Sequence, residues 1–376
     1  MGDTMTRGIG TAAIVLTGCL AACLASGTAD VARAEPAAAP VRAAPLDLAA
    51  PLDLAASLDR AGSLDRAGSR GLAASGTPAS GATDGAAAAA VTAAACDPDV
   101  NIYNRTELCW RVAATVAVMR GTTRAGTVRF DLTHDIRLNP HGRDWAERIT
   151  ISAVQVTGDA ADMTLTLRAS CASPCSTADR FPQGKVITDG LTGVIDYSDA
   201  VSAGQADSAR TGYRLSFVKV GDRSTGFAYE TPISYRCDDA IPAVPAGCVF
   251  PGYTPYLMTL TSLPAVGRDV YAAQGGPGHY GKPGSGHPLH RVTSSAAQAA
   301  NYAAVCGRSV VGSPPRGEAC DEYPFRSTRA GGTAVSKPNR RVAWVPAVQE
   351  SAKNALITNF YDSNRVLNGD PFWVVV

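Results

Sequence analysis

The segment ITISAVQVT, residues Ile149–Thr157, places apolar side chains at close to every second position, between polar ones. This spacing matches a β-strand, in which successive side chains point to opposite faces. Similar runs, rich in Val, Ile, Thr, Tyr and Phe, are separated by Gly, Asp, Asn or Pro, and no long helical period lies between them. They predict an antiparallel β-sandwich over residues 96–265. The runs are Arg111–Met119, Thr127–Thr133, Met163–Ser170, Tyr213–Val220 and Pro232–Cys237.

Three polar residues, Asp131, His134 and Asp135, lie close together at the end of one of these runs. A cluster of this kind is typical of a solvated turn, so we find no catalytic site within residues 96–265.

The sequence after residue 265 changes from strand-like to mixed patterns. A Gly- and Pro-rich stretch at 275–286 is followed by a predicted helix at Ser294–Cys306, whose alanines lie mostly on one face. A strand at Arg341–Val345, a helix after Pro346 and a last strand at Phe372–Val376 complete the pattern. We therefore predict a second, small α+β domain over residues 266–376.

The first 34 residues have the features of an export signal. Arg7 precedes an apolar run, 9–25, and Ala32-Arg33-Ala34 fits the small-x-small pattern of a cleavage site. The run is too short to predict a membrane span. We expect a secreted protein without stable membrane insertion, and the alternative is a lipid anchor on Cys19 or Cys23.

Residues 35–95 contain mainly Ala, Gly, Ser, Pro, Leu and Asp, and a six-residue unit recurs between Pro45 and Gly68. No aromatic residue in this segment could build a core. We interpret it as a disordered linker.

The cysteines predict a disulfide framework. Of the 10 cysteines, two belong to the signal segment, and the other eight form an even set without a Cys-x-x-Cys pair. In an exported chain such a set favours disulfides over a zinc or redox site. Because the cysteines fall in close sequential couples, we predict the pairs Cys96–Cys109, Cys171–Cys175, Cys237–Cys248 and Cys306–Cys320.

Charge distinguishes the two predicted domains. Residues 266–376 contain 12 Lys and Arg against 7 Asp and Glu, a net charge of +5. Since the whole chain has a net charge of +1, the remainder has −4. A basic C-terminal segment on an otherwise acidic chain favours a polyanionic partner such as DNA.

The stretch CDEYPF, residues Cys320–Phe325, holds two adjacent carboxylates, and Arg326 follows it directly. Carboxylate oxygens bind hard divalent cations, and a guanidinium can contact two phosphate oxygens at once. This combination suits metal-assisted attack on a phosphodiester. The alternative, that Asp321 and Glu322 are first-turn acids of a helix, is disfavoured by Pro324 and the flanking aromatic residues.

Four motifs follow one another between residues 283 and 376: Pro288-Leu289-His290-Arg291, Asp321-Glu322-Tyr323-Pro324, Gly331-Gly332 and the ending Asn364–Phe372. In these motifs and their order, the segment resembles the NucA/NucB family of small secreted bacterial deoxyribonucleases. The resemblance implies metal-dependent cleavage of DNA by a small disulfide-containing domain, with Asp321 as the central catalytic residue. It leaves residues 96–265 unassigned.

Roles can be predicted for six residues. We expect Asp321, together with Glu350 from the following helix, to hold Mg²⁺ or Mn²⁺. Asp321, Glu322 or His290 would accept a proton from the attacking water. Arg291 and Arg326 would contact the DNA phosphate. Glu350 has a second explanation, because the first turn of a helix favours a carboxylate through its dipole alone.

Two positions depart from the family's pattern. Cys320 stands where the family usually has Arg, and the stretch QESAKN, 349–354, replaces a Glu/Asp-Asn pair and a Gly-containing turn. Two hypotheses therefore stay open. The first is a secreted metal-dependent endonuclease that cleaves extracellular DNA. The second is a cell-surface binding or structural β-sandwich protein with an inactive nuclease module.

Overall fold

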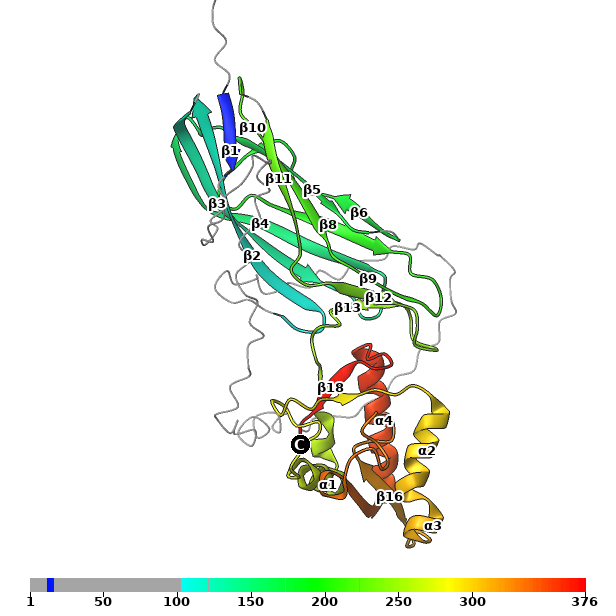
Figure 1. Cartoon of the computed structure of the whole chain (residues 1–376). Coiled ribbons are helices and arrows are strands. Elements are labelled where there is room, and N and C mark those ends of the chain that lie inside the picture. The colour runs from blue at the N-terminus through cyan, green and yellow to red at the C-terminus, as the bar shows by residue number, and fades with distance from the viewer. Residues whose placement is uncertain (1–11, 17–102, 121, 173, 223) are drawn as a thin grey trace, which may run out of the picture. The chain divides into compact units, whose positions relative to one another are not determined.

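The structure, a computed structural model, describes residues 12–16, 103–120, 122–172, 174–222 and 224–376. The predicted linker, the two cysteines considered for a lipid anchor and Cys96 lie outside these residues. Within them the chain forms a β-rich region and a smaller C-terminal region of helices and strands (Figure 1). No helix among the described residues is both long and apolar enough to cross a membrane.

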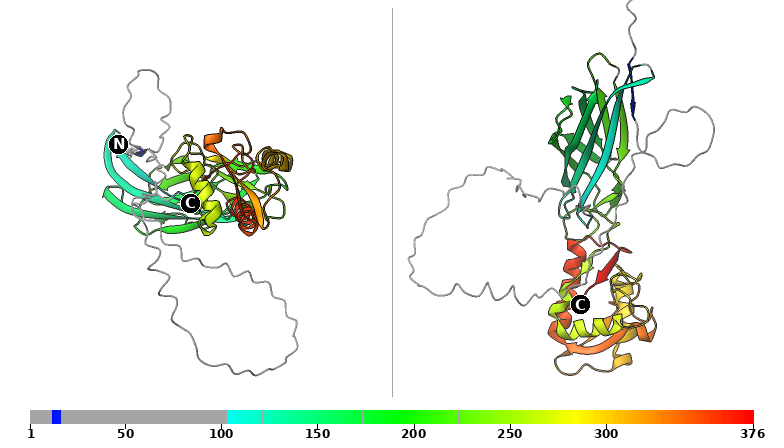
Figure 2. Two further views of the ribbon diagram at one scale, coloured as in Figure 1. Left: turned by 90° about the horizontal axis from the view of Figure 1, so that it is seen from below. Right: turned by 90° about the vertical axis from the view of Figure 1, so that its left-hand side faces the viewer.

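The β-rich region consists of curled antiparallel sheets, whose long strands are seen in Figures 1 and 2. The largest sheet has the order β1 (Ala12–Leu16), β2 (Glu107–Arg120), β3 (Thr123–Arg137), β4 (Asp144–Gly158), β8 (Thr192–Asp199) and β6 (Cys175–Asp179). A second contains β11 (Thr225–Glu230), β10 (Gly212–Val218), β5 (Thr164–Ser170) and β7 (Lys185–Val186). A third contains β13 (Gly247–Val249), β12 (Tyr235–Asp238) and β9 (Ala206–Ala209). All six runs with period two lie within or overlap strands.

The segment Ile149–Thr157 contains a β-bulge. Ile149 and Ile151 are buried, but Val156, later in the same strand, is 45% exposed. The register between β3 and β4 shifts around Ala153, whose φ is +53°. A bulge adds one residue to a strand, so the burial pattern changes face at this point.

One hydrophobic core unites the first two sheets, and it includes Val116 and Phe130 from the larger sheet and Leu167 and Phe217 from the smaller one. This common core holds the strands of the two sheets together. The burial of their apolar faces supplies most of the favourable free energy.

A buried polar network lies in this core, at the place where the sequence predicts a solvated turn. That prediction is wrong, because β3 runs through His134, which is fully buried. Its Nδ1 atom is 2.6 Å from Glu147, and its Nε2 atom is 2.9 Å from the hydroxyl of Tyr229. The hydroxyls of Tyr197 and Tyr213 donate to Glu147 at 2.7 and 2.9 Å. The partners lie on four other strands, β4, β8, β10 and β11, so the sequence around His134 alone gives no sign of this network.

The C-terminal region contains two small sheets and the helices around them. β14 (Tyr256–Leu257), β18 (Pro371–Val374) and β15 (Leu289–His290) form one sheet, and β16 (Glu318–Tyr323) and β17 (Arg341–Pro346) form a hairpin. The helices are α1 (Pro264–Gln274), α2 (Ser295–Cys306), α3 (Arg308–Val311) and α4 (Ala347–Ser363), with 3₁₀ turns at Thr259–Ser262 and Lys337–Asn339. Their core begins at Leu257 and Leu260, a few residues before position 266, where the sequence pattern changes.

Helix α2 begins where the sequence predicts, since the side chain of Ser294 caps it by accepting a hydrogen bond from the backbone N–H of Ala297. Ala296, Ala299, Ala300 and Ala303 lie on one face of this helix as expected, but that face is exposed. An alanine methyl group buries too little surface to decide which face turns inward. Longer side chains on the other face make the contacts.

Three of the predicted disulfides are present in the structure: Cys171–Cys175, Cys237–Cys248 and Cys306–Cys320. Cys109 is also disulfide-bonded, and Cys96, its predicted partner, lies outside the described residues. The Cys306–Cys320 bond joins the end of α2 to β16.

The loop that follows α4 is held by charged groups of the β-rich region. Arg365, 0% exposed and with a positive φ of 47°, donates through Nε to the carboxylate of Asp238 at 2.9 Å. Arg105 donates to the backbone oxygen of Arg365 at 2.9 Å and pairs with Asp370 at 3.1 Å. Arg236 also pairs with Asp370, at 2.9 Å. Every charge in this cluster therefore has a partner of opposite sign.

We expect Arg365→Met to destabilise the protein by about 3–5 kcal/mol, because it leaves the carboxylate of Asp238 buried without a counter-charge. Thermal or urea unfolding of the full chain measures this loss. Arg308→Met is the matched control, since Arg308 is exposed on α3 and the structure describes no ion pair for it. Equal midpoints for the two variants would contradict the importance of the ion pair.

The pKa of Asp370 gives a pH-dependent prediction. Burial alone would raise this pKa, but hydrogen bonds and charge from Arg236 and Arg105 outweigh it and hold the pKa below its usual range. The stabilisation is therefore present above pH about 4, the pKa of an unfolded Asp, and is lost as the pH falls further. The difference in thermal midpoint between wild type and Asp370→Asn should thus shrink on acidification.

Candidate active site

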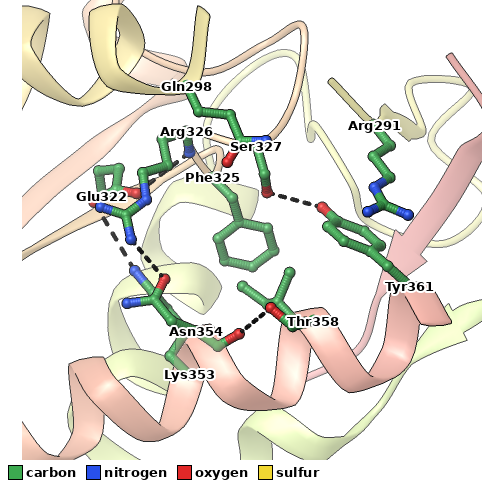
Figure 3. Close-up of a pocket in the computed structure, with 11 residues that line it drawn as sticks. Arg291, Gln298, Glu322, Phe325, Arg326, Ser327, Lys353, Asn354, Thr358 and Tyr361 are labelled. Atoms are coloured by element: carbon green, nitrogen blue, oxygen red, sulfur yellow. Dashed lines mark hydrogen bonds and ion pairs between the residues drawn. The ribbon is translucent and has the colours of Figure 1, made fainter. Parts of the chain in front are cut away.

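A cavity of about 160 Å³ opens in the C-terminal region (Figure 3). The cavity is polar and mainly cationic, because Arg291, Arg326 and Lys353 line it together with a single carboxylate, Glu322. Its remaining lining residues are Gln298 of α2, Phe325 and Ser327 after β16, and Asn354, Ile357, Thr358 and Tyr361 of α4. A cavity of about 150 Å³ accommodates benzene, so this one has room for a phosphate group.

The β16–β17 hairpin and α4 bring three carboxylates together beside the cavity. Asp321 and Glu322 lie in β16, where Asp321 is paired with Ala343 of β17. Pro346 ends β17, and α4 begins at the next residue, so the helix packs directly back onto the hairpin. This turn brings Glu350, in the first turn of α4, to the two carboxylates of β16.

Lys353 lies between these carboxylates, and its side chain is only 1% exposed. Its Nζ atom is 2.5 Å from Asp321, 2.8 Å from Glu350 and 3.9 Å from Glu322. Asp321 and Glu322 are each 2% exposed and Glu350 is 7% exposed. The ammonium group is thus enclosed by three buried carboxylates, which we call the acidic cluster.

Burial and neighbouring charges set the pKa values of this cluster. Burial raises the pKa of Glu350 to about 7, although the charge of Lys353 opposes the shift. Burial also raises the pKa of Glu322, again against the charge of Lys353 and a backbone hydrogen bond from Arg326. Burial would lower the pKa of Lys353, but the three carboxylates outweigh it and raise this pKa. Lys353 is therefore held in its charged form.

The two arginines are fixed by aromatic rings and by hydrogen bonds. Arg326 lies over the ring of Tyr302, with its guanidinium carbon 5.0 Å from the ring centre, and donates to Asn354 at 3.2 Å. Arg291 lies 4.4 Å over the ring of Tyr361 and donates to the backbone oxygen of Val366. Both guanidinium groups are therefore oriented before any ligand enters.

The segment after Phe325 is held by α2. Asn301 donates to the backbone oxygens of Arg326 and Thr328 at 2.9 and 3.1 Å. Gly332, with a positive φ of 64°, passes so close that an added Cβ would lie 2.9 Å from the Cα atom of Asn301. A side chain at this position would disturb the contact, which gives the glycine pair a structural role.

Comparison with known families gives one match. Residues 285–375 match the family model Deoxyribonuclease NucA/NucB. The C-terminal region is a NucA/NucB-like domain. No curated protein and no solved structure matches the chain.

The structure separates the six predicted site residues of the NucA/NucB-like domain into three groups. Glu322, Arg291 and Arg326 line the cavity. Asp321 and Glu350 contact Lys353 and are not part of the lining. His290 is also outside the lining, and its Nδ1 atom is 3.0 Å from the backbone oxygen of Gly369. The structure therefore shows Asp321 behind Lys353 rather than facing the cavity.

The sequence patterns did not predict a role for Lys353, which the three carboxylates of the acidic cluster enclose. One signal was available, because Glu350 and Lys353 are three residues apart and such residues are neighbours on one helix face.

The donor set does not fit the predicted divalent cation while Lys353 is in place. A Mg²⁺ or Ca²⁺ ion lies roughly 2.0–2.6 Å from its oxygen ligands. The Nζ atom already lies at 2.5 Å from Asp321 and 2.8 Å from Glu350, the two predicted ligands. An ion bound to both would overlap the ammonium group and be repelled by its charge.

The Cys306–Cys320 bond provides a test of how the site is anchored. It joins residues 14 positions apart, and Cys320 directly precedes Asp321. Replacing both cysteines by serine should lower the free energy of unfolding by roughly 2–4 kcal/mol. The control replaces Cys171 and Cys175, which close a loop of only 4 positions in the β-rich region. It should cost less stability, and a larger loss in the control would refute the anchoring role.

Proposed function

We propose that this protein is a secreted endonuclease that hydrolyses phosphodiester bonds of DNA. The observation that carries the proposal is the cationic cavity, which lies within the segment matched by the NucA/NucB family model. All eleven of its lining residues fall between positions 291 and 361, inside that segment. The site thus belongs to the NucA/NucB-like domain alone.

The cavity provides for a phosphate group. The guanidinium groups of Arg291 and Arg326 would contact its oxygens, and the buried ammonium of Lys353 would add positive charge at the back of the cavity. A guanidinium can donate two parallel hydrogen bonds to a phosphate. Positive groups fixed in advance also stabilise the charge that develops on the oxygens in the transition state.

Glu322 is the group that we assign as the proton acceptor. It is the carboxylate that lines the cavity, and burial makes it a stronger base than an exposed Glu by raising its pKa. In this reaction an oxygen of water forms a new bond to phosphorus, and its proton passes to Glu322. The bond between phosphorus and one sugar oxygen breaks, and that oxygen leaves as a hydroxyl after taking a proton from solvent water.

The disulfides support an extracellular location. Disulfides persist in oxidising compartments and are rare in the cytosol. The bonds at Cys171–Cys175, Cys237–Cys248 and Cys306–Cys320 are consistent with export, as is the predicted signal segment. DNA outside the cell is then the substrate that the protein would meet.

The proposal is tested by incubating the full mature chain with supercoiled plasmid and following the nicked and linear forms on a gel. We expect Arg326→Met to reduce the rate of nicking by roughly 10²-fold, the usual effect of removing one donor to a transition-state oxyanion. Glu322→Gln, which keeps the shape but cannot accept a proton, should be equally impaired. Binding of the plasmid should weaken as salt rises, since phosphate contacts release counterions.

The control for these variants is Lys337→Met, which removes an exposed charge outside the cavity. It should nick plasmid at the wild-type rate. If the wild type binds DNA but never nicks it, the second hypothesis would hold, that of a binding or structural β protein with an inactive nuclease module. The enclosure of Lys353 by the carboxylates is the observation that favours this alternative.

A further inference from the structure

Lys353 has the position and the surroundings of a bound cation. It extends from the second turn of α4 into a space that the hairpin and the first turn of the helix close. Nearly all water is excluded from it, since its side chain is 1% exposed. The charged oxygens around it come from β16 on one side and from α4 on the other.

The acidic cluster needs a positive charge at this place in order to fold. Removing charged carboxylates from water without a counter-charge is strongly unfavourable. Among the described residues, Lys353 is the only cationic side chain with ion pairs to these carboxylates. Arg326 approaches the cluster through its backbone N–H, which donates to Glu322 at 3.2 Å. Its guanidinium group points to Asn354 instead.

The geometry points to Lys353 as the resident cation of the acidic cluster, in the place where a divalent metal ion is expected. The cluster formed by Asp321, Glu322 and Glu350 then takes up no divalent ion in the folded protein. The ammonium group supplies the positive charge at the back of the cavity, and Arg291 and Arg326 supply it at the sides. The assignment of Lys353 does not depend on the proposed function. Only the statement that the cavity receives a phosphodiester rests on it.

The remaining contacts of the cluster agree with an ammonium rather than a metal centre. The second oxygen of Glu350, Oε1, accepts a hydrogen bond from Asn354 at 3.0 Å. One oxygen of Glu322 accepts the backbone N–H of Arg326, and the other lies 3.9 Å from Nζ. A single octahedral ion would need oxygens at about 2.0–2.1 Å from several directions. In the cluster, Nζ donates a hydrogen bond to Asp321 at 2.5 Å and forms ion pairs with Glu350 and Glu322 at 2.8 and 3.9 Å.

The test measures metal binding directly, on the full mature chain after treatment with EDTA and dialysis. Mn²⁺ is titrated by calorimetry, and the thermal midpoint is recorded with and without Mn²⁺. We expect no stoichiometric binding to the wild type and no rise of its midpoint. Lys353→Ala empties the space among the carboxylates, so Mn²⁺ should bind it and raise its midpoint. Lys337→Met should behave as the wild type does.

A second variant guards against failure of Lys353→Ala to fold. If the wild type binds one equivalent of Mn²⁺ and Asp321→Asn loses that binding, the inference is overturned, whatever happens to the lysine variant. Stoichiometric binding that Asp321→Asn retains would place the ion elsewhere and leave Lys353 as the cation of the cluster. The latter outcome supports the inference.

Nicking of plasmid gives an independent measurement. We expect the EDTA-treated wild type to keep its rate of nicking within about twofold. The inference would be overturned if EDTA abolished nicking, Mn²⁺ restored it, and the binding of Mn²⁺ depended on Asp321. Absence of nicking by every sample would instead overturn the proposed function. The Mn²⁺ titration would still decide the assignment of Lys353, because it requires no catalysis.

Discussion

The ion pairs of Lys353 are the interaction on which the candidate active site depends. Asp321, Glu322 and Glu350 are all nearly inaccessible to water, and such a group of like charges is stable only around a cation. Lys353 provides this charge from α4 and thereby fixes the helix against the β16–β17 hairpin. The same contact turns Asp321 away from the cavity and leaves Glu322 to line it.

Buried ion pairs reduce the number of basic residues in the C-terminal segment that are available to DNA. Of the 12 basic residues between positions 266 and 376, Lys353 and Arg365 are buried in ion pairs. Arg365 is neutralised by Asp238 of the β-rich region, so its charge is unavailable to DNA. The attraction for a polyanion must then come from the accessible residues, including the arginines that line the cavity.

The two regions of the protein share buried polar contacts, not only the chain that joins them. Arg105 and Arg236 come from the β-rich region, and both pair with Asp370 of the NucA/NucB-like domain. A fragment that began near residue 270 would lose these partners, and it would also lose Leu257 and Leu260 from its core. Because these charged groups are buried, removing the partner on one side leaves an uncompensated charge and destabilises the protein.

The sequence by itself determined the elements with strong local patterns. The runs of period two became strands, Ser294 capped the helix expected after it, and the close cysteine couples 171–175, 237–248 and 306–320 became disulfides. The ordered motifs also identified the NucA/NucB-like segment. These features depend on neighbours in the chain, such as the alternation of side chains along a strand or the first turn of a helix, and so they can be read locally.

Only the tertiary structure decided how the charges are partnered. His134 meets Glu147, Arg365 meets Asp238, and Lys353 meets Asp321 across 32 positions of sequence. Whether an ionisable residue is a solvated surface group or part of a buried cluster depends on which distant residue packs against it. That choice follows from the packing of whole strands and helices, because the cost of burying a charge depends on its complete surroundings.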